Sequence, residues 1–554
     1  MQEKIFLHLN TTTFLTGETL YFKMYCMNPV NTSRSLISKI GYIELIDSDK
    51  KVVSKSKIYI DKGVGKGDYF LPTTLKTGNY KIVAYTKWML NSSSTNFEVI
   101  DITIINPFQP KQGANFSNNS DTSLITENRT VTKQNATATG AVDKTNSVIE
   151  TNKKTYSNRE KVNLNSNQLS NGIGKGNYSI SVRKLVNLPI NKQKSAVEFK
   201  EINTKTNSNN PTTDINIVPE FRGELITGSI SSDKAELSIS NKIISLSIPG
   251  KSFALKTLKT NSLGKFTFIL DKNPNNTNCV IQVIDDNRND YSIQLDEFQK
   301  TQTASLSFSS NLNLTENDSI AIQEQSTANQ IENAYYEIKK DSLVTNYKTD
   351  SFFNTFQKEY VLDNYTRFPT FKETIIEVVI ELYYRKNNGS YKVYVRNDKK
   401  DLTVYGPPLV LVDGVVIQDT NELFDYNMAN VYKISLVNEG YVYGPGLFGG
   451  LVSIETKNND YQTKATGNYI IQTEIQRPLN ETKFFTPDYT DRSKNERIPD
   501  YRYQLLWLPE ITSFNKENPI SFYTSDVTGI FEVSLEGFTE QGVPISLKDT
   551  FEVQ

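Results

Sequence analysis

Apolar and polar residues alternate with a period of two along most of this chain, which is the pattern of half-buried β-strands. In the run 5–10, Ile5, Leu7 and Leu9 take one face, and the even-numbered set that includes His8 takes the other. Turn signals rich in Gly, Asp and Ser interrupt such runs at 16–18, 47–49, 63–67 and 76–78. Short strands at this spacing predict a β-sandwich over residues 1–108.

The same pattern divides the rest of the chain into five further segments. Residues 109–147 are rich in Asn, Ser, Thr and Gln without apolar periodicity, which predicts a flexible linker. Strand patterns predict further sandwiches at 148–215, 216–300 and 461–554. Between the last two, residues 301–460 predict a helical segment followed by an α+β domain. The predicted fold class is therefore mainly β, a string of β-sandwiches with one α+β domain.

Helical periodicity is confined to the middle of the chain. Ala328 to Lys340 places apolar residues at helical spacing, and Phe371 to Lys386 does so more strongly. Thr370 and Glu373 have the form of a capping box at the start of the second run. We expect two helices, the second of them packed on a sheet.

Strand signals return after the second predicted helix. The pair Asp413-Gly414 separates the apolar runs 409–412 and 415–417, which is a strong hairpin signal. Residues 431–437 and 451–456 read as two more strands.

The charge balance argues against one class of function. The 554 residues, enough for about four domains, include 61 basic and 62 acidic side chains, a formal net charge of -1. This balance gives no long-range field toward nucleic acid or an anionic membrane. We find no basic cluster with interleaved aromatic residues, and we predict no nucleic-acid partner.

Candidate chemistry is sparse. His8 is the one histidine, it lies off the Ile5 face, and no nucleophile elbow accompanies it, so a structural or surface role is expected. Cys26 and Cys279 share strand faces with apolar residues, which predicts small buried thiols. Three scattered His and Cys residues do not predict a zinc site.

Two loops imitate ligand-binding motifs. Gly444 to Gly449 has the letters of a dinucleotide loop, but a strand follows it and Pro445 lacks an amide donor, so we expect a tight turn. Asp285 to Asp296 has a spacing faintly like a calcium loop, with Asp290 where glycine is needed. We predict no catalytic residues, no metal and no cofactor, and hence no enzyme. Paired carboxylates that meet only in the fold stay open.

Several motifs together resemble a known sandwich. Residues 3–9, 16–23, 67–72, 78–89 and 104–107 resemble the macroglobulin-type domain at the start of large Bacteroidota envelope proteins. The resemblance implies immunoglobulin/macroglobulin-like sandwiches at 1–108 and 148–215. The thioester motif of protease-trapping macroglobulins surrounds neither cysteine, so only the scaffold is implied. Residues 216–300 resemble a carboxypeptidase-regulatory-like sandwich through Gly223, 226–230 and 261–268.

A second resemblance concerns the α+β domain. Pro408 to Val415, Val431 to Leu436 and Gly449 to Lys457 resemble the plug domain of TonB-dependent receptors, and 362–370 matches the same Bacteroidota proteins. Such a receptor continues with a barrel of about 22 strands, whereas about a hundred residues follow Lys457 and read as a sandwich. A plug-like domain without its own barrel is therefore expected.

These resemblances imply a function of holding other proteins. We expect a non-catalytic accessory or scaffold subunit of an outer-membrane β-barrel complex, in barrel assembly or protein export. Its partners would be outer-membrane β-barrel proteins and their accessory lipoproteins. One alternative is an accessory of a TonB-dependent uptake receptor. Another is a surface scaffold, adhesin or glycan-binding module.

The expected contact site is the aromatic and glycine loop 440–450, with Tyr441, Tyr443, Leu447 and Phe448 as candidate contact residues. The alternative is that the loop 440–450 is a turn needed only for the fold and contacts no partner.

Two tripeptides, at 318–320 and 341–343, resemble O-glycosylation sites of that phylum and make Ser319 and Ser342 candidate acceptors. No secretory signal or transmembrane span is visible in the sequence, and the family resemblance favours a chain whose leader was removed. We expect the cell envelope, outer-membrane associated and outward-facing, with the periplasm as the alternative.

Overall fold

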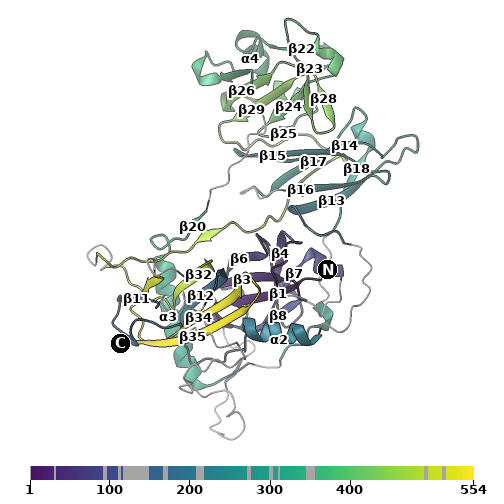
Figure 1. Ribbon diagram of the computed structural model, residues 1–554. Helices are drawn as coiled ribbons and strands as arrows, with labels where there is room; N and C mark the ends of the chain where they lie inside the picture. Colours follow the sequence, from purple (N-terminus) through teal and green to yellow (C-terminus); the bar gives the residue numbers. More distant parts are fainter. Residues whose placement is uncertain are drawn as a thin grey trace. The chain divides into compact units, whose positions relative to one another are not determined.

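The computed structural model describes residues 2–29, 33–91, 97–109, 114–116, 149–165, 173–206, 217–270, 276–297, 303–309, 312–344, 356–387, 389–491, 497–514 and 519–554. Strands predominate over helices in these ranges, which confirms the mainly β class (Figure 1). The chain forms two compact units. Unit 1 comprises Met1–Arg222, Lys300–Val344 and Pro478–Gln554, and unit 2 comprises Gly223–Gln299 and Thr345–Arg477. Within the described ranges no helix has the length and apolarity needed to cross a membrane.

The first sandwich of unit 1 pairs a three-stranded sheet, ordered β1-β3-β6, with a five-stranded sheet, ordered β2-β8-β7-β4-β5. Ile5, Leu7 and Leu9 are buried, as the alternation predicts. The strands are β1 (Lys4–Leu9), β2 (Thr13–Leu15), β3 (Thr19–Met27), β4 (Ile40–Ile46), β5 (Val52–Tyr59), β6 (Val64–Phe70), β7 (Gly78–Thr86) and β8 (Glu98–Ile105).

The opposite face of the three-stranded sheet is also covered. His8 and Lys23 stand opposite each other on β1 and β3 and are 3% and 1% exposed. An apolar cluster beside them joins this face to helix α2 (Ala196–Thr206) and strand β34 (Gly529–Thr539). Its buried members are Phe6, Tyr25, Met27, Ala196, Phe199 and Phe538. The even positions of β1 are therefore interior positions.

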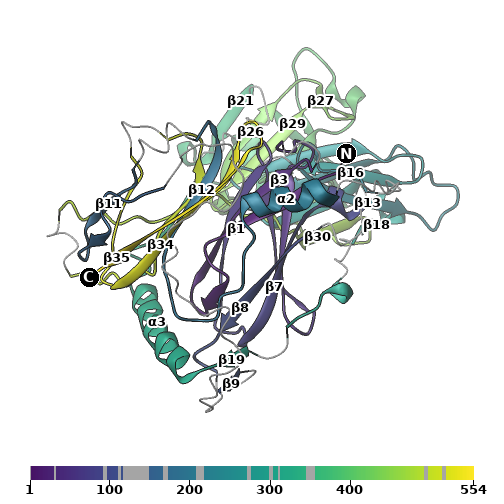
Figure 2. The ribbon, with the colours of Figure 1, turned by 60° about the horizontal axis from the view of Figure 1, so that its bottom comes forward.

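A second five-stranded sheet in unit 1 joins segments that lie far apart in the sequence. Its order is β10-β35-β34-β12-β32, and β12 pairs antiparallel with both β34 and β32. Figure 2 shows β12, β34 and β35 of this sheet side by side. The expectation of separate sandwiches at 148–215 and 461–554 is wrong, because alternation identifies the faces of a strand but not its partner. The other strands are β10 (Thr155–Tyr156), β12 (Gly176–Lys184), β32 (Gln504–Ile511) and β35 (Pro544–Val553).

Helix α3 (Glu316–Ala334) also belongs to unit 1 and begins earlier than predicted. Thr315 and Asp318 form a capping box at its start. The helix expected at 328–340 coincides only with its last turns, and 301–460 is not one domain.

The predicted linker 109–147 lies outside the described residues from 110 onward, except for β9 (Ala114–Phe116). This strand pairs in parallel with β19 (Leu312–Leu314).

Unit 2 contains a sandwich that matches most of the predicted segment 216–300. Its sheets have the orders β16-β13-β18 and β15-β14-β17-β30. The strands are β13 (Glu224–Ser231), β14 (Ile243–Ile248), β15 (Ala254–Lys259), β16 (Lys265–Leu270), β17 (Asn278–Ile284), β18 (Ser292–Leu295) and β30 (Ile470–Glu474). Strand β30 falls inside the expected C-terminal segment, so that boundary is also wrong.

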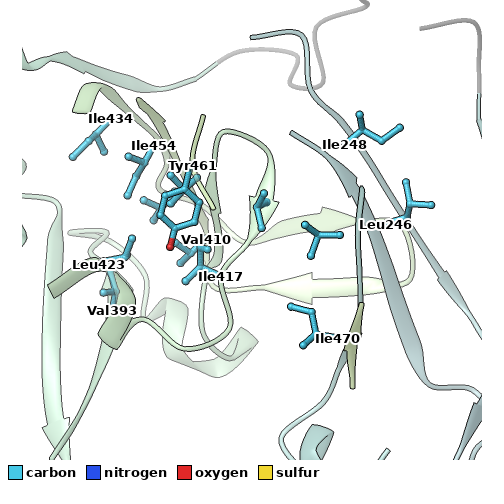
Figure 3. Packing of buried hydrophobic residues seen from close by; sticks show 14 of the residues in the cluster. Leu246, Ile248, Val393, Val410, Ile417, Leu423, Ile434, Ile454, Tyr461 and Ile470 are labelled. Atoms are coloured by element: carbon cyan, nitrogen blue, oxygen red, sulfur yellow. The ribbon is translucent and has the colours of Figure 1, made fainter. Parts of the chain in front are cut away.

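The rest of unit 2 is an α+β domain around a mixed sheet, ordered β21-β26-β29-β24-β25. Its buried residues are continuous with those of the neighbouring sandwich, as Figure 3 shows for Leu246, Val410, Ile454 and Ile470. The elements are β21 (Lys358–Val361), α4 (Phe371–Glu377), β24 (Leu409–Val412), β25 (Val415–Val416), α5 (Asn421–Phe424), β26 (Val431–Val437) and β29 (Leu451–Thr456).

The second predicted helix is half right. The capping box of Thr370 and Glu373 is confirmed at the start of α4. The helix ends at Glu377, however, and β22 (Leu382–Asn387) follows it and pairs with β23 (Ser390–Val395). The expected helix to Lys386 is therefore wrong in its second half.

Candidate partner-binding site

The predicted hairpin at Asp413-Gly414 is confirmed and organises the sheet below the candidate site. Both residues have positive φ, 48° and 86°, as the mirror-image hairpin turn requires. The Asp413 carboxylate is buried and accepts hydrogen bonds from the Thr456 amide at 2.8 Å, the Thr456 hydroxyl at 2.6 Å and the Tyr461 amide at 3.1 Å. These bonds tie the end of β29 to the β24–β25 turn.

A second buried carboxylate holds the segment that follows β29. Glu422 on α5 accepts hydrogen bonds from the Tyr461 hydroxyl at 2.7 Å, the Thr463 hydroxyl and the Lys464 amide. Burial, followed by the contact with Glu422, raises the pKa of Tyr461. Residues 456–464 are thus fixed at several points.

The candidate loop 440–450 is a hairpin made of β27 (Tyr441–Tyr443) and β28 (Gly446–Phe448). It connects β26 to β29, so the tight turn expected there is confirmed. Gly444 at the turn has φ of 52°, and a Cβ atom on it would lie 2.1 Å from the Thr257 hydroxyl oxygen. Only glycine fits this approach to the neighbouring sandwich of unit 2.

Three of the four candidate contact residues lie on the inner face of this hairpin. Tyr441, Tyr443 and Phe448 pack against an apolar cluster, and the Tyr443 hydroxyl donates a hydrogen bond to the Leu255 carbonyl oxygen. Burial raises the pKa of both tyrosines. The buried members of the cluster are Leu255, Leu409, Leu411, Val416 and Leu451. These half-buried aromatic residues anchor the hairpin, and their expected role as contact residues stays a prediction.

The fourth candidate, Leu447, lies on the outer face with Val442, which was not among the residues predicted from the sequence. The two stand opposite each other across the hairpin and are 53% and 68% exposed. The 3-10 turn Leu402–Tyr405 lies at the base of the hairpin, with the Tyr405 ring beside Gly440, and its residues Val404 and Tyr405 are exposed. We call Val404, Tyr405, Val442 and Leu447 the hairpin patch.

The remaining candidate groups have structural positions in the part of the chain described. His8 Nδ1 shares a 2.7 Å hydrogen bond with the Ser179 hydroxyl, and burial lowers the pKa of the ring to about 3. Cys26 and Cys279 are free and buried, as predicted, and burial raises the pKa of Cys279 to about 12. Among the described residues no group of His, Cys, Asp and Glu is arranged to hold a metal ion.

The two candidate glycosylation serines lie on different elements of unit 1. Ser319 is exposed on the first turn of α3, where neighbouring Asp318 is occupied by the capping box. Ser342 is exposed on the short strand β20 (Ser342–Leu343), which pairs with β31 (Thr482–Lys483). Both hydroxyls are accessible, and their modification stays a prediction.

The outer face of the β22–β23 hairpin was not predicted from the sequence. There the register brings together Tyr383, Arg385, Lys392 and Tyr394, a basic cluster with interleaved aromatic residues. Asn388-Gly389 in the sequence was the available signal, since Asn-Gly between strands is typical of a two-residue hairpin. The helix expected through Lys386 concealed it.

No family model matches this chain, and no curated protein does. Among solved structures, Escherichia coli alpha-2-macroglobulin activated by porcine elastase is similar at 10% identity, with a TM-score of 0.24, over 100% of this chain and 44% of that one. A Salmonella alpha-2-macroglobulin mutant is similar at 10% identity, with a TM-score of 0.25, over 100% of this chain and 39% of that one. A tandem repeat of a large adhesion protein has 7% identity and a TM-score of 0.13 over the whole of both chains.

The chain thus spans less than half the length of the two macroglobulins. At these TM-scores the likenesses do not support an argument about function.

Proposed function

We propose that this protein is a non-catalytic binding module of the cell envelope that docks on a separate outer-membrane β-barrel protein through the hairpin patch. The observation that carries the proposal is the division of the β27–β28 hairpin into two faces. Its inner face is held by packing and by the Tyr443 hydrogen bond, whereas its outer face exposes Val442 and Leu447. A rigid loop that exposes paired apolar side chains is suited to bind a protein.

The chemistry of the patch supports a protein partner. Single exposed apolar residues are common on protein surfaces, but Val442 and Leu447 form an exposed pair, and the Tyr405 ring lies beside Gly440 at the base of the same hairpin. Aromatic and aliphatic anchors of this kind contribute much of the binding energy in protein interfaces. The choice of a β-barrel partner for assembly or export rests on the resemblance of 408–457 to a plug domain.

The test is co-purification of the tagged full chain from detergent-solubilised outer membranes of the native host. We expect an assembly or export barrel to be enriched with the unaltered chain. In the double variant Val442→Asp, Leu447→Asp its recovery should fall at least about tenfold, since charge at the centre of an apolar contact costs more than 1.4 kcal/mol. Leu263→Asp is the matched control, because Leu263 is 67% exposed in the same unit but lies on a different turn.

Three results would count against the proposal. Equal recovery of the barrel with both variants would show that the patch is not the contact. Enrichment of an uptake receptor alone would favour the uptake accessory. Isolation of the chain as a free soluble protein would contradict docking on any barrel.

A further inference from the structure

The outer face of the β22–β23 hairpin is a ladder of tyrosine and arginine side chains in unit 2. On the inner face of the same hairpin Leu382, Val393 and Val395 are buried in the unit's core. On the outer face Tyr383 stands opposite Tyr394, and the next row pairs Arg385 with Lys392. Arg396 flanks the tyrosine row at the other end, where its amide bonds to the Glu381 carbonyl oxygen.

The side chains of this face stack on one another. The Tyr383 and Tyr394 rings have centroids 5.5 Å apart and planes inclined by 22°. The guanidinium of Arg385 lies 5.2 Å from the Tyr394 ring, and that of Arg396 lies 5.8 Å from the Tyr383 ring. The aromatic rings thereby orient both guanidinium groups, whose N–H donors stay exposed. We call these four residues with Lys392 the arginine ladder.

The arginine ladder has an excess of positive charge. Among the described residues, no carboxylate forms an ion pair with Arg385, Lys392 or Arg396. Two acids lie nearby: Glu381 accepts a hydrogen bond from Tyr360 and pairs with Lys358, and Asp401 accepts from Thr403 and interacts with Arg385 through space without an ion-pair contact. Oriented guanidinium groups that make no ion-pair contact with a carboxylate match carboxylates, sulfates or phosphates of a ligand.

We propose that the arginine ladder binds an acidic polysaccharide, a sugar chain that carries uronate carboxylates. Carboxylates would pair with the guanidinium forks, and sugar hydroxyls would hydrogen-bond to the tyrosine hydroxyls. This inference rests on the β22–β23 face alone and does not depend on a barrel partner for the β27–β28 hairpin.

Two other polyanions fit the face less well. Single-stranded nucleic acid binds by stacking its bases on free aromatic faces, but here the rings are engaged with each other and with guanidinium groups. An acidic peptide gains affinity from apolar anchors in pockets, whereas the aliphatic residues of this hairpin point to the core.

The test measures binding of the full chain to oligogalacturonate by calorimetry at low and moderate salt. We expect saturable binding that weakens with salt. Arg385→Gln with Arg396→Gln should weaken it at least about tenfold, because both charge-assisted pairings with the carboxylates are lost. Lys399→Gln with Lys400→Gln removes the same charge from exposed residues just beyond β23 and should leave affinity within about twofold.

Competing ligands complete the experiment. Methyl-esterified oligogalacturonate, which lacks the carboxylates, should not bind, and Tyr383→Phe with Tyr394→Phe should bind oligogalacturonate more weakly. Equal loss in the ladder and control variants would overturn the proposal, because it would indicate net charge alone. Tighter binding of oligothymidylate or polyglutamate would assign the ladder to those polymers instead.

Discussion

Two alternating faces of this molecule look alike in the sequence and differ completely in the structure. The even face of β1 carries Phe6 and His8 and is covered within unit 1, whereas on the outer face of β22 Arg385 is exposed and Tyr383 is half-buried. Covering the face of β1 changes the protonation of its polar groups, because burial lowers the pKa of His8 to about 3 and that of neighbouring Lys23 to about 7. A polar residue in an alternating strand is therefore a candidate for function only once its face is known to be open.

The largest expected contrast between the two faces is in packing. Phe6→Ala removes a fully buried ring from the cluster with Tyr25 and Phe538, and we expect a loss of about 3–5 kcal/mol in the unfolding free energy of unit 1. Tyr394→Ala on the open face should cost about 1 kcal/mol or less. Tryptophan fluorescence follows unit 1 during denaturation, because Trp88 and Trp507 both lie in it. Amide hydrogen exchange follows unit 2. Similar costs at both sites would mean that the faces are equally covered.

The next contrast concerns charge. Lys23 has a folded pKa of about 7 against an ordinary value of 10.5, so between these values the unfolded chain holds a proton that the folded chain has released. The unfolding free energy should therefore rise from pH 7 toward pH 9.5, by an amount of the order of 3 kcal/mol. Lys23→Met should raise stability at pH 7 and abolish the rise. A rise that persists in the variant would assign it to another group.

A smaller loss of stability is expected when the hydroxyl group of Tyr443 is removed. Tyr443→Phe removes the hydrogen bond to the Leu255 carbonyl and should cost about 1 kcal/mol, seen as faster amide exchange across β27 and β28. The hairpin patch should then bind its partner more weakly, although no patch residue has changed. Unaltered exchange would show that packing alone anchors the hairpin.

The smallest effect is expected at Tyr383→Phe. No hydrogen bond of the Tyr383 hydroxyl to another described residue is present, so the stability of unit 2 should change by less than about 0.5 kcal/mol. Exchange across β22 and β23 should match that of the unaltered chain. A larger loss of stability would mean that the Tyr383 hydroxyl, like the Tyr443 hydroxyl, helps to hold its hairpin.

Local signals in the sequence predicted local structure well. The capping box at Thr370 and the mirror-image turn at Asp413-Gly414 both formed as expected, because each depends on residues within one turn. The end of α4 was missed, since Val378, Val379 and Leu382 satisfy a helical stripe while serving the core in another conformation. The pair Asn388-Gly389 in the sequence is the signal for the two strands, β22 and β23, that follow α4.

Long-range information was not available from the pattern. Nothing in the run 176–184 indicates that β12 pairs with β34, because one strand face can match many partners. At the candidate site the turn within 440–450 was predicted, and contact of this loop with a partner stays a prediction. The sequence did not show that Tyr441, Tyr443 and Phe448 lie on the inner face, because inward and outward positions of a short hairpin depend on what lies beneath it.

The pairing of β12 with β34 also constrains how the protein is made. The Ser179 hydroxyl and the Glu536 carbonyl oxygen that it reaches are separated by 357 positions in the sequence. During synthesis the first sandwich and β12 emerge well before β34, while the whole of unit 2 is produced in between. The uncovered face around Phe6, Tyr25 and β12 must therefore wait, with its apolar side chains accessible, until the last strands arrive.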